Sequence, residues 1–314
     1  MKKTSQLEFV ISQSKKYKQL YVYYGIEDLK NKIQPALLQI LIDFDKMCKK
    51  HSIYYVITAG TLLGAVREKG FIAWDDDIDV LVKPDAYGKI REAVKEKELS
   101  QEYDFISPDT SNEIALDAKF VSKKISLGTL MGDEKIGHPL YIDVLSIENV
   151  PNNFFLKSIK GILSNLFFLS YTSLRCLRKY DELLNVMAKD SKELWLNLMI
   201  RKMVAIPAII LGKHRTYKLL MKISSYADNV TKYVTVPLGV LHYKGEIQCR
   251  EVFETSVPME FENHTFPAPK GYLEYLNNRY GSDYMTPPPK SEQGIKCFQK
   301  RADWKEILKG KYYE

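Results

Sequence analysis

Four aspartates stand close together in residues 74–79, which read Trp-Asp-Asp-Asp-Ile-Asp. Residues 77–82 alternate as a β-strand does, so Asp77 and Asp79 share one face while the residues between them point into a core. Two carboxylates this close repel each other unless a cation neutralises them. Their hard oxygen ligands suit Mg²⁺ or Mn²⁺, which bridge protein carboxylates to phosphates. The spacing therefore predicts metal-dependent phosphoryl transfer.

A third acid lies on a later strand-like segment. Residues 140–145 read Leu-Tyr-Ile-Asp-Val-Leu, and a carboxylate at Asp143 among apolar neighbours needs a partner. The alternative is that the acids form a solvated loop, with Asp79 as an edge charge. Acids on two separate strands favour a metal site, with Asp75 and Asp76 as supporting loop residues.

Residues ahead of the acids could hold a phosphate. Gly60 and Thr61 can offer backbone N–H groups and a hydroxyl at the start of a short helix, although Thr61 would also serve as an ordinary N-cap. Arg67 and Lys69 could offset phosphate charge, with surface solvation as the alternative for Lys69. Trp74 could stack on a base or ring, but a tryptophan beside a strand is more often core.

The elements that must position these residues follow from periodicity. Apolar residues at helical spacing, after a proline suited to a first turn, predict a helix over residues 35–50 that covers a sheet. A turn at residues 58–61 joins a buried strand to a short helix, and a helical pattern runs from Pro84 to Lys97. The predicted strands are residues 53–57, 77–82, 103–106, 115–121 and 140–145.

These elements predict an α/β (α+β) fold with a mixed sheet core flanked by helices. Residues 1–30 are expected to form an N-terminal arm and residues 31–150 the catalytic core. Residues 151–233 carry helical spacing with apolar and basic residues and predict a helical insertion. Residues 234–314 are rich in Pro and Tyr, contain a short helix that closes at Gly281, and are expected to pack back on the core.

Composition limits the remaining possibilities. The chain has 314 residues, 45% of them hydrophobic, a formal charge of +7 and four scattered cysteines, which indicates a packed protein of a reducing compartment. The apolar runs at residues 161–174 and 203–212 are shorter than the ~20 residues that a spanning helix needs. We therefore expect a cytoplasmic protein whose basic residues 154–227 either contact the inner face of the plasma membrane or form a solvated lid. The sequence contains no RNP, helix-turn-helix or zinc pattern, so we do not expect it to bind nucleic acid.

The segment 58–67, Thr-Ala-Gly-Thr-Leu-Leu-Gly-Ala-Val-Arg, together with Gly-Phe-Ile at 70–72 and the acids at 74–79, resembles the signature of the LicD family. That family is related to the fukutin-type proteins within the nucleotidyltransferase-like superfamily. Residues 141–144 resemble its second acidic strand and residues 266–281 its C-terminal segment. The chain departs from the family where Ala59 replaces a common glycine and where Leu-Ser follows Val144 in place of Phe-Pro.

The resemblance implies transfer of a phospho-alcohol, most often phosphocholine, from a CDP-linked donor to a sugar of a surface glycopolymer, with release of CMP. By the same resemblance, Asp77 and Asp79 would bind the metal and Asp143 would be a third ligand or the base. The acceptor would be a lipid-linked or polymeric sugar of teichoic acid, lipopolysaccharide or capsule.

Two other readings use the same sequence. A nucleotidyltransferase would transfer NMP from an NTP with the same acids and release pyrophosphate. A non-catalytic module would instead use the basic surface to hold a polyanion or a membrane.

Overall fold

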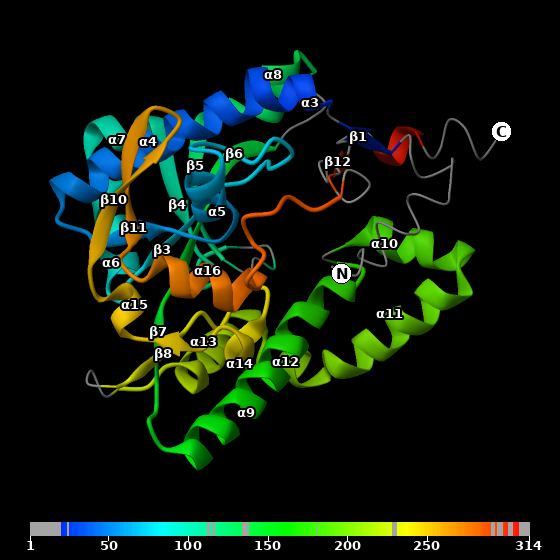
Figure 1. Ribbon diagram of the computed structural model, residues 1–314. Coiled ribbons are helices and arrows are strands. Elements are labelled where there is room, and N and C mark those ends of the chain that lie inside the picture. Colours follow the sequence, from blue (N-terminus) through cyan, green and yellow to red (C-terminus); the bar gives the residue numbers. More distant parts are fainter. Residues whose placement is uncertain are drawn as a thin grey trace.

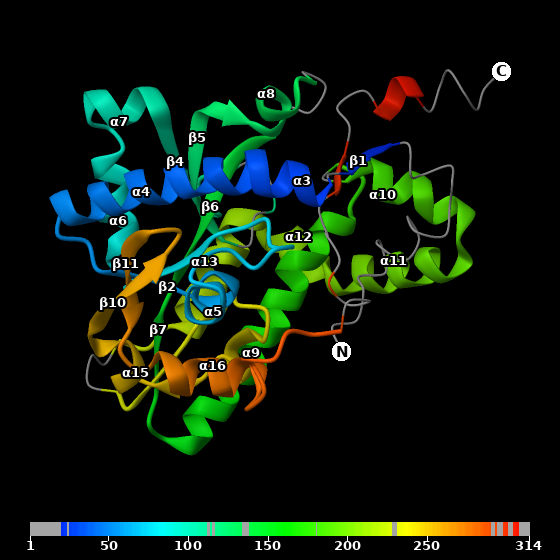
Figure 2. The same cartoon turned by 45° about the horizontal axis from the view of Figure 1, so that its top comes forward.

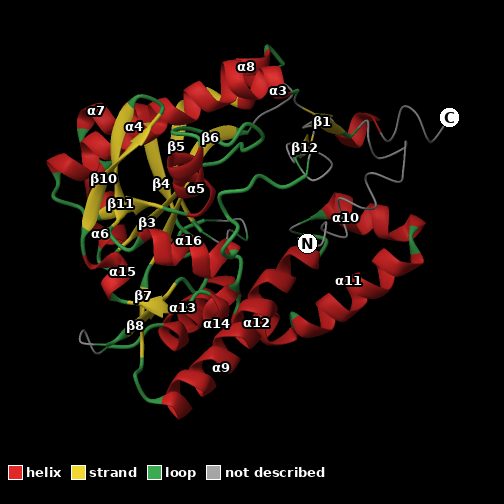
Figure 3. Ribbon diagram, in the orientation of Figure 1, coloured by secondary structure: helices red, strands yellow, loops and turns green. Residues whose placement is uncertain are grey.

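A five-stranded mixed sheet forms the centre of the fold (Figures 1 and 3). Its strands lie in the order β2 (Tyr55–Ile57), β3 (Asp79–Val82), β6 (Pro139–Ser146), β5 (Ala118–Ser126) and β4 (Tyr103–Ile106). β3 and β6 run parallel and the other neighbouring strands antiparallel. The predicted mixed α/β core is confirmed. The computed structural model describes residues 20–23, 25–111, 114, 117–133, 138–179, 181–227, 231–289, 293, 298–300 and 304–307.

Helix α4 (Gln34–Lys50) covers one face of this sheet, as its periodicity predicts. The ring of Phe44 meets Tyr55 and Phe120 edge-on, with centroids 5.2 and 5.3 Å apart. Phe120 pairs with Ile142 in the sheet, so Ile142 points toward α4. Because successive residues of a strand point to opposite faces, Asp143 points away from α4. The acids of the sequence motif therefore lie on the face that α4 leaves open.

The remaining elements surround this core. The other helices are α3 (Ile26–Asp28), the π-helix η1 (Leu29–Ile33), α5 (Ala59–Arg67), α6 (Ala86–Ala93), α7 (Lys97–Glu102), α8 (Leu127–Met131), α9 (Phe154–Ser173), η2 (Leu174–Cys176), α10 (Glu182–Met187), η3 (Ala188–Asp190), α11 (Lys192–Val204), α12 (Ile206–Leu211), α13 (Lys213–Ser224), α14 (His242–Gly245), α15 (Glu251–Glu254) and α16 (Tyr272–Tyr280). The other strands are β1 (Tyr21–Tyr23), β7 (Glu148–Val150), β8 (Tyr233–Thr235), β9 (Gln248–Cys249), β10 (Ser256–Phe261), β11 (His264–Pro269) and β12 (Phe298–Lys300).

Several predicted elements differ in their bounds. β2 and β3 each begin two residues later than predicted, so Asp77 lies before its strand and not on it, and β6 is one residue longer at each end. The helical pattern from Pro84 to Lys97 is two helices, because the N–H groups of Lys95 and Glu96 bond three residues back and close α6 in a turn before α7 begins. The strand predicted at residues 115–121 is β5, which begins three residues later and continues to Ser126 through an irregularity. The predicted pattern identified the type of each element better than its ends.

The C-terminal region contains strands that the sequence analysis missed. β10 and β11 form a hairpin whose turn residues Glu262 and Asn263 have φ values of 51° and 59°. Pro258 lies opposite Pro267 in this hairpin. Proline lacks an N–H group and disguises a strand in the sequence, but a two-stranded sheet tolerates it because each strand keeps a free edge.

The helical insertion forms a separate group of helices beside the core (Figure 1). Its α9 contacts α11, α12 and α13. In the small sheet β7–β8–β9, a strand from before the helical insertion pairs with strands from the C-terminal region. The predicted domain boundaries at residues 150 and 233 therefore remain predictions. Most of the expected N-terminal arm, residues 1–19, lies outside the described residues. Among the helices that the structure describes, none is long and apolar enough to cross a membrane.

Candidate active site

Two parallel strands bring Asp79 and Asp143 side by side. Asp79 opens β3 and is the direct partner of Asp143 on β6. The N–H of Asp143 donates to the carbonyl of Ile78 at 2.9 Å, and the N–H of Asp79 donates to Thr61 Oγ1 at 2.9 Å. Neighbouring strands lie about 4.8 Å apart, so the two carboxylates share one small region of the open face.

Asp77 lies two residues before Asp79, outside β3 and in the loop that leads into the strand. Burial raises the pKa of Asp79 well above its usual value, and the nearby carboxylates of Asp77, Asp143, Asp117 and Asp75 raise it further. This concentration of negative charge is unfavourable unless a proton or a cation compensates it. The structure thus brings the predicted acids together with one that was not predicted, Asp117.

The sequence analysis also missed the ion pair of Lys119 with Asp143. Lys119 lies opposite Asp143 on β5, and its Nζ is 2.5 Å from Asp143 Oδ1 and 3.6 Å from the centroid of the Tyr141 ring. Burial alone lowers the pKa of Lys119, but Asp143, Tyr141 and Asp117 more than offset this, and the net shift is upward. Lys119 therefore remains an ammonium and partly neutralises the acids.

Asp117 immediately precedes β5 and has an unusual environment. Its Oδ1 is buried and, among the residues that the structure describes, has no hydrogen-bond partner. Burial and the charge of Asp143 raise the pKa of Asp117 to about 7, against the opposite effect of Lys119. The residues from Asp117 to Phe120 alternate charged and apolar, and this alternation is the signal that could have identified Asp117 and Lys119 from the sequence.

The chemistry of these acids suits a hard divalent cation. They are carboxylates that repel one another, and one buried oxygen of Asp117 has no partner in the described part of the chain. Within the described residues, however, no three His, Cys, Asp or Glu side chains are arranged to hold a metal ion. The ammonium of Lys119 already occupies one oxygen of Asp143. Asp77, Asp79 and Asp143 thus lie in one region without forming a finished three-ligand site.

The predicted phosphate turn has a more structural role than expected. A Cβ at Gly60 would lie 2.5 Å from Asp75 Oδ2, so the carboxylate of Asp75 lies against the start of α5. Thr61 is 3% exposed, and its hydroxyl accepts from the N–H of Asp79. The neighbouring Ala59 adopts a φ of 47°, a left-handed conformation that costs a residue other than glycine about 1–2 kcal/mol. This strained turn fixes where Asp79 begins its strand.

Arg67 and Lys69 contact residues other than the acids in the described part of the chain. The side chain of Arg67 is 7% exposed; its Nε donates to Glu68 Oε1 at 2.8 Å and its Nη1 to the carbonyl of Tyr284 at 3.3 Å. Lys69 is exposed, and its carbonyl accepts from the N–H of Glu262 in the β10–β11 turn. In the described contacts, both residues tie the motif to the C-terminal region.

The loop that carries the acids is fixed by a buried amide. Gln34 Nε2 donates to the carbonyls of Ile72 and Asp75 at 3.2 and 2.9 Å. Trp74 is partly buried against the core, as expected, and Asp76 is partly buried in the same loop. The start of α4 thus fixes the backbone of the acidic loop through Gln34.

The family profile of the LicD/FKTN/FKRP nucleotidyltransferase domain matches residues 52–131. The chain contains a LicD-family nucleotidyltransferase domain. Over 273 residues the chain is 28% identical to the lipopolysaccharide cholinephosphotransferase LicD of Haemophilus influenzae, covering 83% of this chain and 92% of that protein. It is also 26% identical over 120 residues to an uncharacterized protein of Rickettsia prowazekii, covering 38% of this chain and 42% of that protein. The LicD relationship makes the protein a transferase.

The region around the acids extends beyond the matched segment. Asp143 lies outside residues 52–131, and so does α16. Thr58 Oγ1 donates to Tyr275 Oη at 2.9 Å, directly before the strained turn. Burial raises the pKa of Tyr280, and the charge of Asp79 contributes to this rise while Arg279 opposes it. The C-terminal helix therefore closes over the start of β3.

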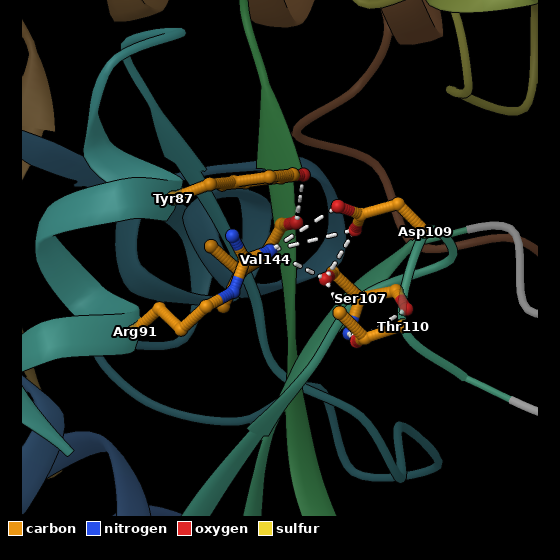
Figure 4. A network of polar contacts seen from close by, with 6 residues as sticks. All are labelled: Tyr87, Arg91, Ser107, Asp109, Thr110 and Val144. Atoms are coloured by element: carbon orange, nitrogen blue, oxygen red, sulfur yellow. Dashed lines mark hydrogen bonds and ion pairs between the residues drawn. The ribbon is translucent and has the colours of Figure 1, made fainter. Parts of the chain in front are cut away.

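Polar contacts hold α6 against β6 and against the residues that follow β4 (Figure 4). Tyr87 Oη donates to the carbonyl of Val144 at 2.7 Å, next to Asp143. On the same helix, Arg91 Nη2 donates to Ser107 Oγ at 2.9 Å and lies 3.4 Å from Asp109 Oδ1. Ser107 Oγ in turn donates to Asp109 Oδ1 at 2.5 Å. The strand that carries Asp143 is thus fixed independently of the site itself.

Proposed function

We propose that this transferase moves a phospho-alcohol, first of all phosphocholine, from a CDP-linked donor to a sugar hydroxyl of a cell-surface glycopolymer and releases CMP. The observation that carries the proposal is the registration of Asp79 with Asp143 on parallel strands, with Lys119 on the second acid. The 28% identity to a lipopolysaccharide cholinephosphotransferase across most of both chains supports the choice of phosphocholine.

The acids have separate roles in this proposal. Asp77 and Asp79 would hold Mg²⁺ or Mn²⁺, which when bound neutralises the donor's diphosphate. Lys119 pairs with one oxygen of Asp143 and orients its carboxyl group, so that Asp143 can position the acceptor hydroxyl and accept its proton. Thr61 and Gln34 contribute by fixing Asp79 and the acidic loop before the donor binds.

The reaction is a single displacement at phosphorus. The acceptor oxygen forms a bond to the phosphorus that carries the alcohol, and the bond from that phosphorus to the bridging oxygen breaks. The bridging oxygen leaves with CMP, while the hydroxyl proton passes to Asp143. Positioning and charge compensation supply the catalysis, as in other phosphoryl transfers.

The test is an incubation of the full chain with Mg²⁺, a lipid-linked or polymeric sugar acceptor, and CDP-choline, CDP-ribitol or CDP-glycerol in turn. We expect CMP to appear with at least one donor and the acceptor to gain the mass of the phospho-alcohol. Asp79→Asn should abolish this product, while Asp104→Asn, at an exposed position on β4 of the same sheet, should leave it unchanged.

The same assay with nucleoside triphosphates separates the two reaction types. Release of pyrophosphate and addition of NMP to the acceptor, without CMP from any CDP donor, would replace the proposal by nucleotidyl transfer.

A further inference from the structure

Helix α9 exposes a long apolar stripe to the outside. The apolar residues of this face are Phe155, Ile159, Ile162, Leu166 and Leu169. The face that packs on the protein buries Phe168 and Tyr171 but otherwise small or polar residues: Gly161 is buried, and Ser164 Oγ lies 2.7 Å from Ser224 Oγ of α13. A helix of a water-soluble surface normally turns its apolar stripe inward, so this outer face is built to contact something apolar.

The two lysines of α9 are turned onto the protein. Lys157 Nζ lies 4.3 Å from the centroid of the Tyr233 ring. Lys160 Nζ donates to the carbonyls of Ile223 and Ser225 at 2.8 and 2.9 Å, and burial lowers its pKa. The outer face of α9 therefore lacks their charges although the helix contains both.

Two neighbouring helices extend this surface. α9 contacts α11 and α12, and the three lie side by side in both views of the molecule (Figures 1 and 2). The exposed apolar residues of α11 and α12 are Trp195, Leu196, Ile200, Met203, Ile206, Ile209 and Ile210. We call the exposed apolar residues of these three helices the apolar face. Scattered exposed apolar residues need no explanation, but a surface built from three helices does.

The charge of the region that contains the apolar face is strongly one-sided. Residues 151–227 contain 13 Lys or Arg and four Asp or Glu, and residues 194–227 contain no acid. Exposed basic residues of this region include Arg175, Arg178, Arg201, Arg215, Lys218 and Lys222. In a symmetric dimer through this face, the basic residues of one copy would oppose those of the other. An anionic lipid surface offers the complementary charge together with an apolar interior.

We propose that the apolar face lies in the head-group region of an anionic lipid bilayer, with the basic residues around it on the lipid phosphates. The contact is peripheral, since none of the helices in the described part of the chain could cross a bilayer. This inference is independent of the reaction proposed above, because it rests on the helical insertion and not on the acids.

The test uses the full chain and vesicles of phosphatidylcholine with or without phosphatidylglycerol. We expect the chain to co-sediment with the anionic vesicles and much less with the neutral ones. Leu166→Gln combined with Ile210→Gln should weaken this binding by roughly tenfold for each side chain removed from lipid. The matched control is Leu273→Gln on α16, because Leu273 and Leu166 are both 56% exposed, and it should bind as the unaltered chain does.

A second measurement does not require an altered apolar face. Trp195 is 50% exposed on α11, whereas Trp74 and Trp304 are more buried. Phosphatidylglycerol vesicles with brominated acyl chains should quench the fluorescence of the unaltered chain, and Trp195→Phe should remove most of that quenching. Binding without such quenching, or equal binding of the double variant and the control, would overturn the proposal. So would a stable dimer that ignores vesicles and dissociates in the double variant, since the face would then join two copies of the chain.

Discussion

The buried carboxyl of Glu148 on β7 should make the protein less stable as the pH rises. Its side chain accepts a hydrogen bond from Ser146 Oγ at 2.6 Å. Burial raises the pKa of Glu148 from 4.5 to about 7, although the bond from Ser146 acts in the opposite direction. Among the described residues, the charge of Glu148 helps to raise the pKa of the hydroxyls of Tyr87, Tyr217 and Tyr243. These hydroxyls therefore stay neutral between pH 4.5 and 8.

The sign follows from where each state holds its proton. Between pH 4.5 and 7 the unfolded chain has lost the proton of Glu148 while the folded chain keeps it, so the free energy of unfolding falls as the pH rises. At 1.36 kcal/mol per pH unit, the two pKa values correspond to about 3 kcal/mol lost by pH 8. Glu148→Gln cannot ionise and should escape this loss.

Urea unfolding followed by circular dichroism at pH 4.5, 6 and 8 measures the effect. The free energy of unfolding of Glu148→Gln, minus that of the unaltered chain, should rise by about 3 kcal/mol from the lowest pH to the highest. The control is Glu260→Gln, an exposed glutamate on β10, for which this difference should stay constant. A constant difference for Glu148→Gln as well would refute the assignment of a buried, neutral carboxyl.

Two further predictions concern the elements that position the site. In Gly64→Ala, the new Cβ would lie 2.4 Å from a backbone carbonyl oxygen of the following loop, which cannot rotate away, so thermal unfolding should show a loss of about 1–3 kcal/mol. Gly88→Ala on α6 meets no atom within 4 Å and should instead stabilise by about 0.5–1 kcal/mol; equal effects of the two would contradict this packing. Lys119→Met should stop CMP release and cost about 3 kcal/mol of stability, because it leaves its partner carboxylate unpaired, whereas Lys123→Met, exposed on the same strand, should do neither.

Strand parity predicted part of the arrangement of the acids. Alternation in residues 77–82 assigned Asp77 and Asp79 to one open face, and alternation in residues 140–145 assigned Asp143 to one face of a later strand. In the structure Asp79 and Asp143 are direct partners on parallel strands, whereas Asp77 lies in the loop before β3. Parity is reliable here because the apolar residues between the acids, including Ile78 and Ile142, are fully buried on the other face. A shift of one residue would have reversed both faces at once, so a buried face fixes the register strongly.

Parity could not predict which partners the acids find across the sheet. Lys119 pairs with Asp143 because β5 lies antiparallel beside β6. The alternation of residues within one strand does not reveal which strand will lie beside it. The same limit applies to Arg67, whose position toward the site suggested a phosphate ligand. Its contact with the carbonyl of Tyr284 depends on a chain segment 217 residues away. Local pattern thus specifies faces, and long-range pairing decides which charges on a face are compensated.

The hydroxyl of Thr61 shows how these two levels meet. From the sequence it could be either an N-cap or a phosphate ligand, since both roles suit a threonine at the start of a short helix. The structure uses it to accept the N–H of Asp79, which opens β3. Thr61 is 3% exposed, so its hydroxyl is buried at the point where it holds Asp79. The turn therefore fixes the start of the strand that carries Asp79, and its phosphate role remains a prediction.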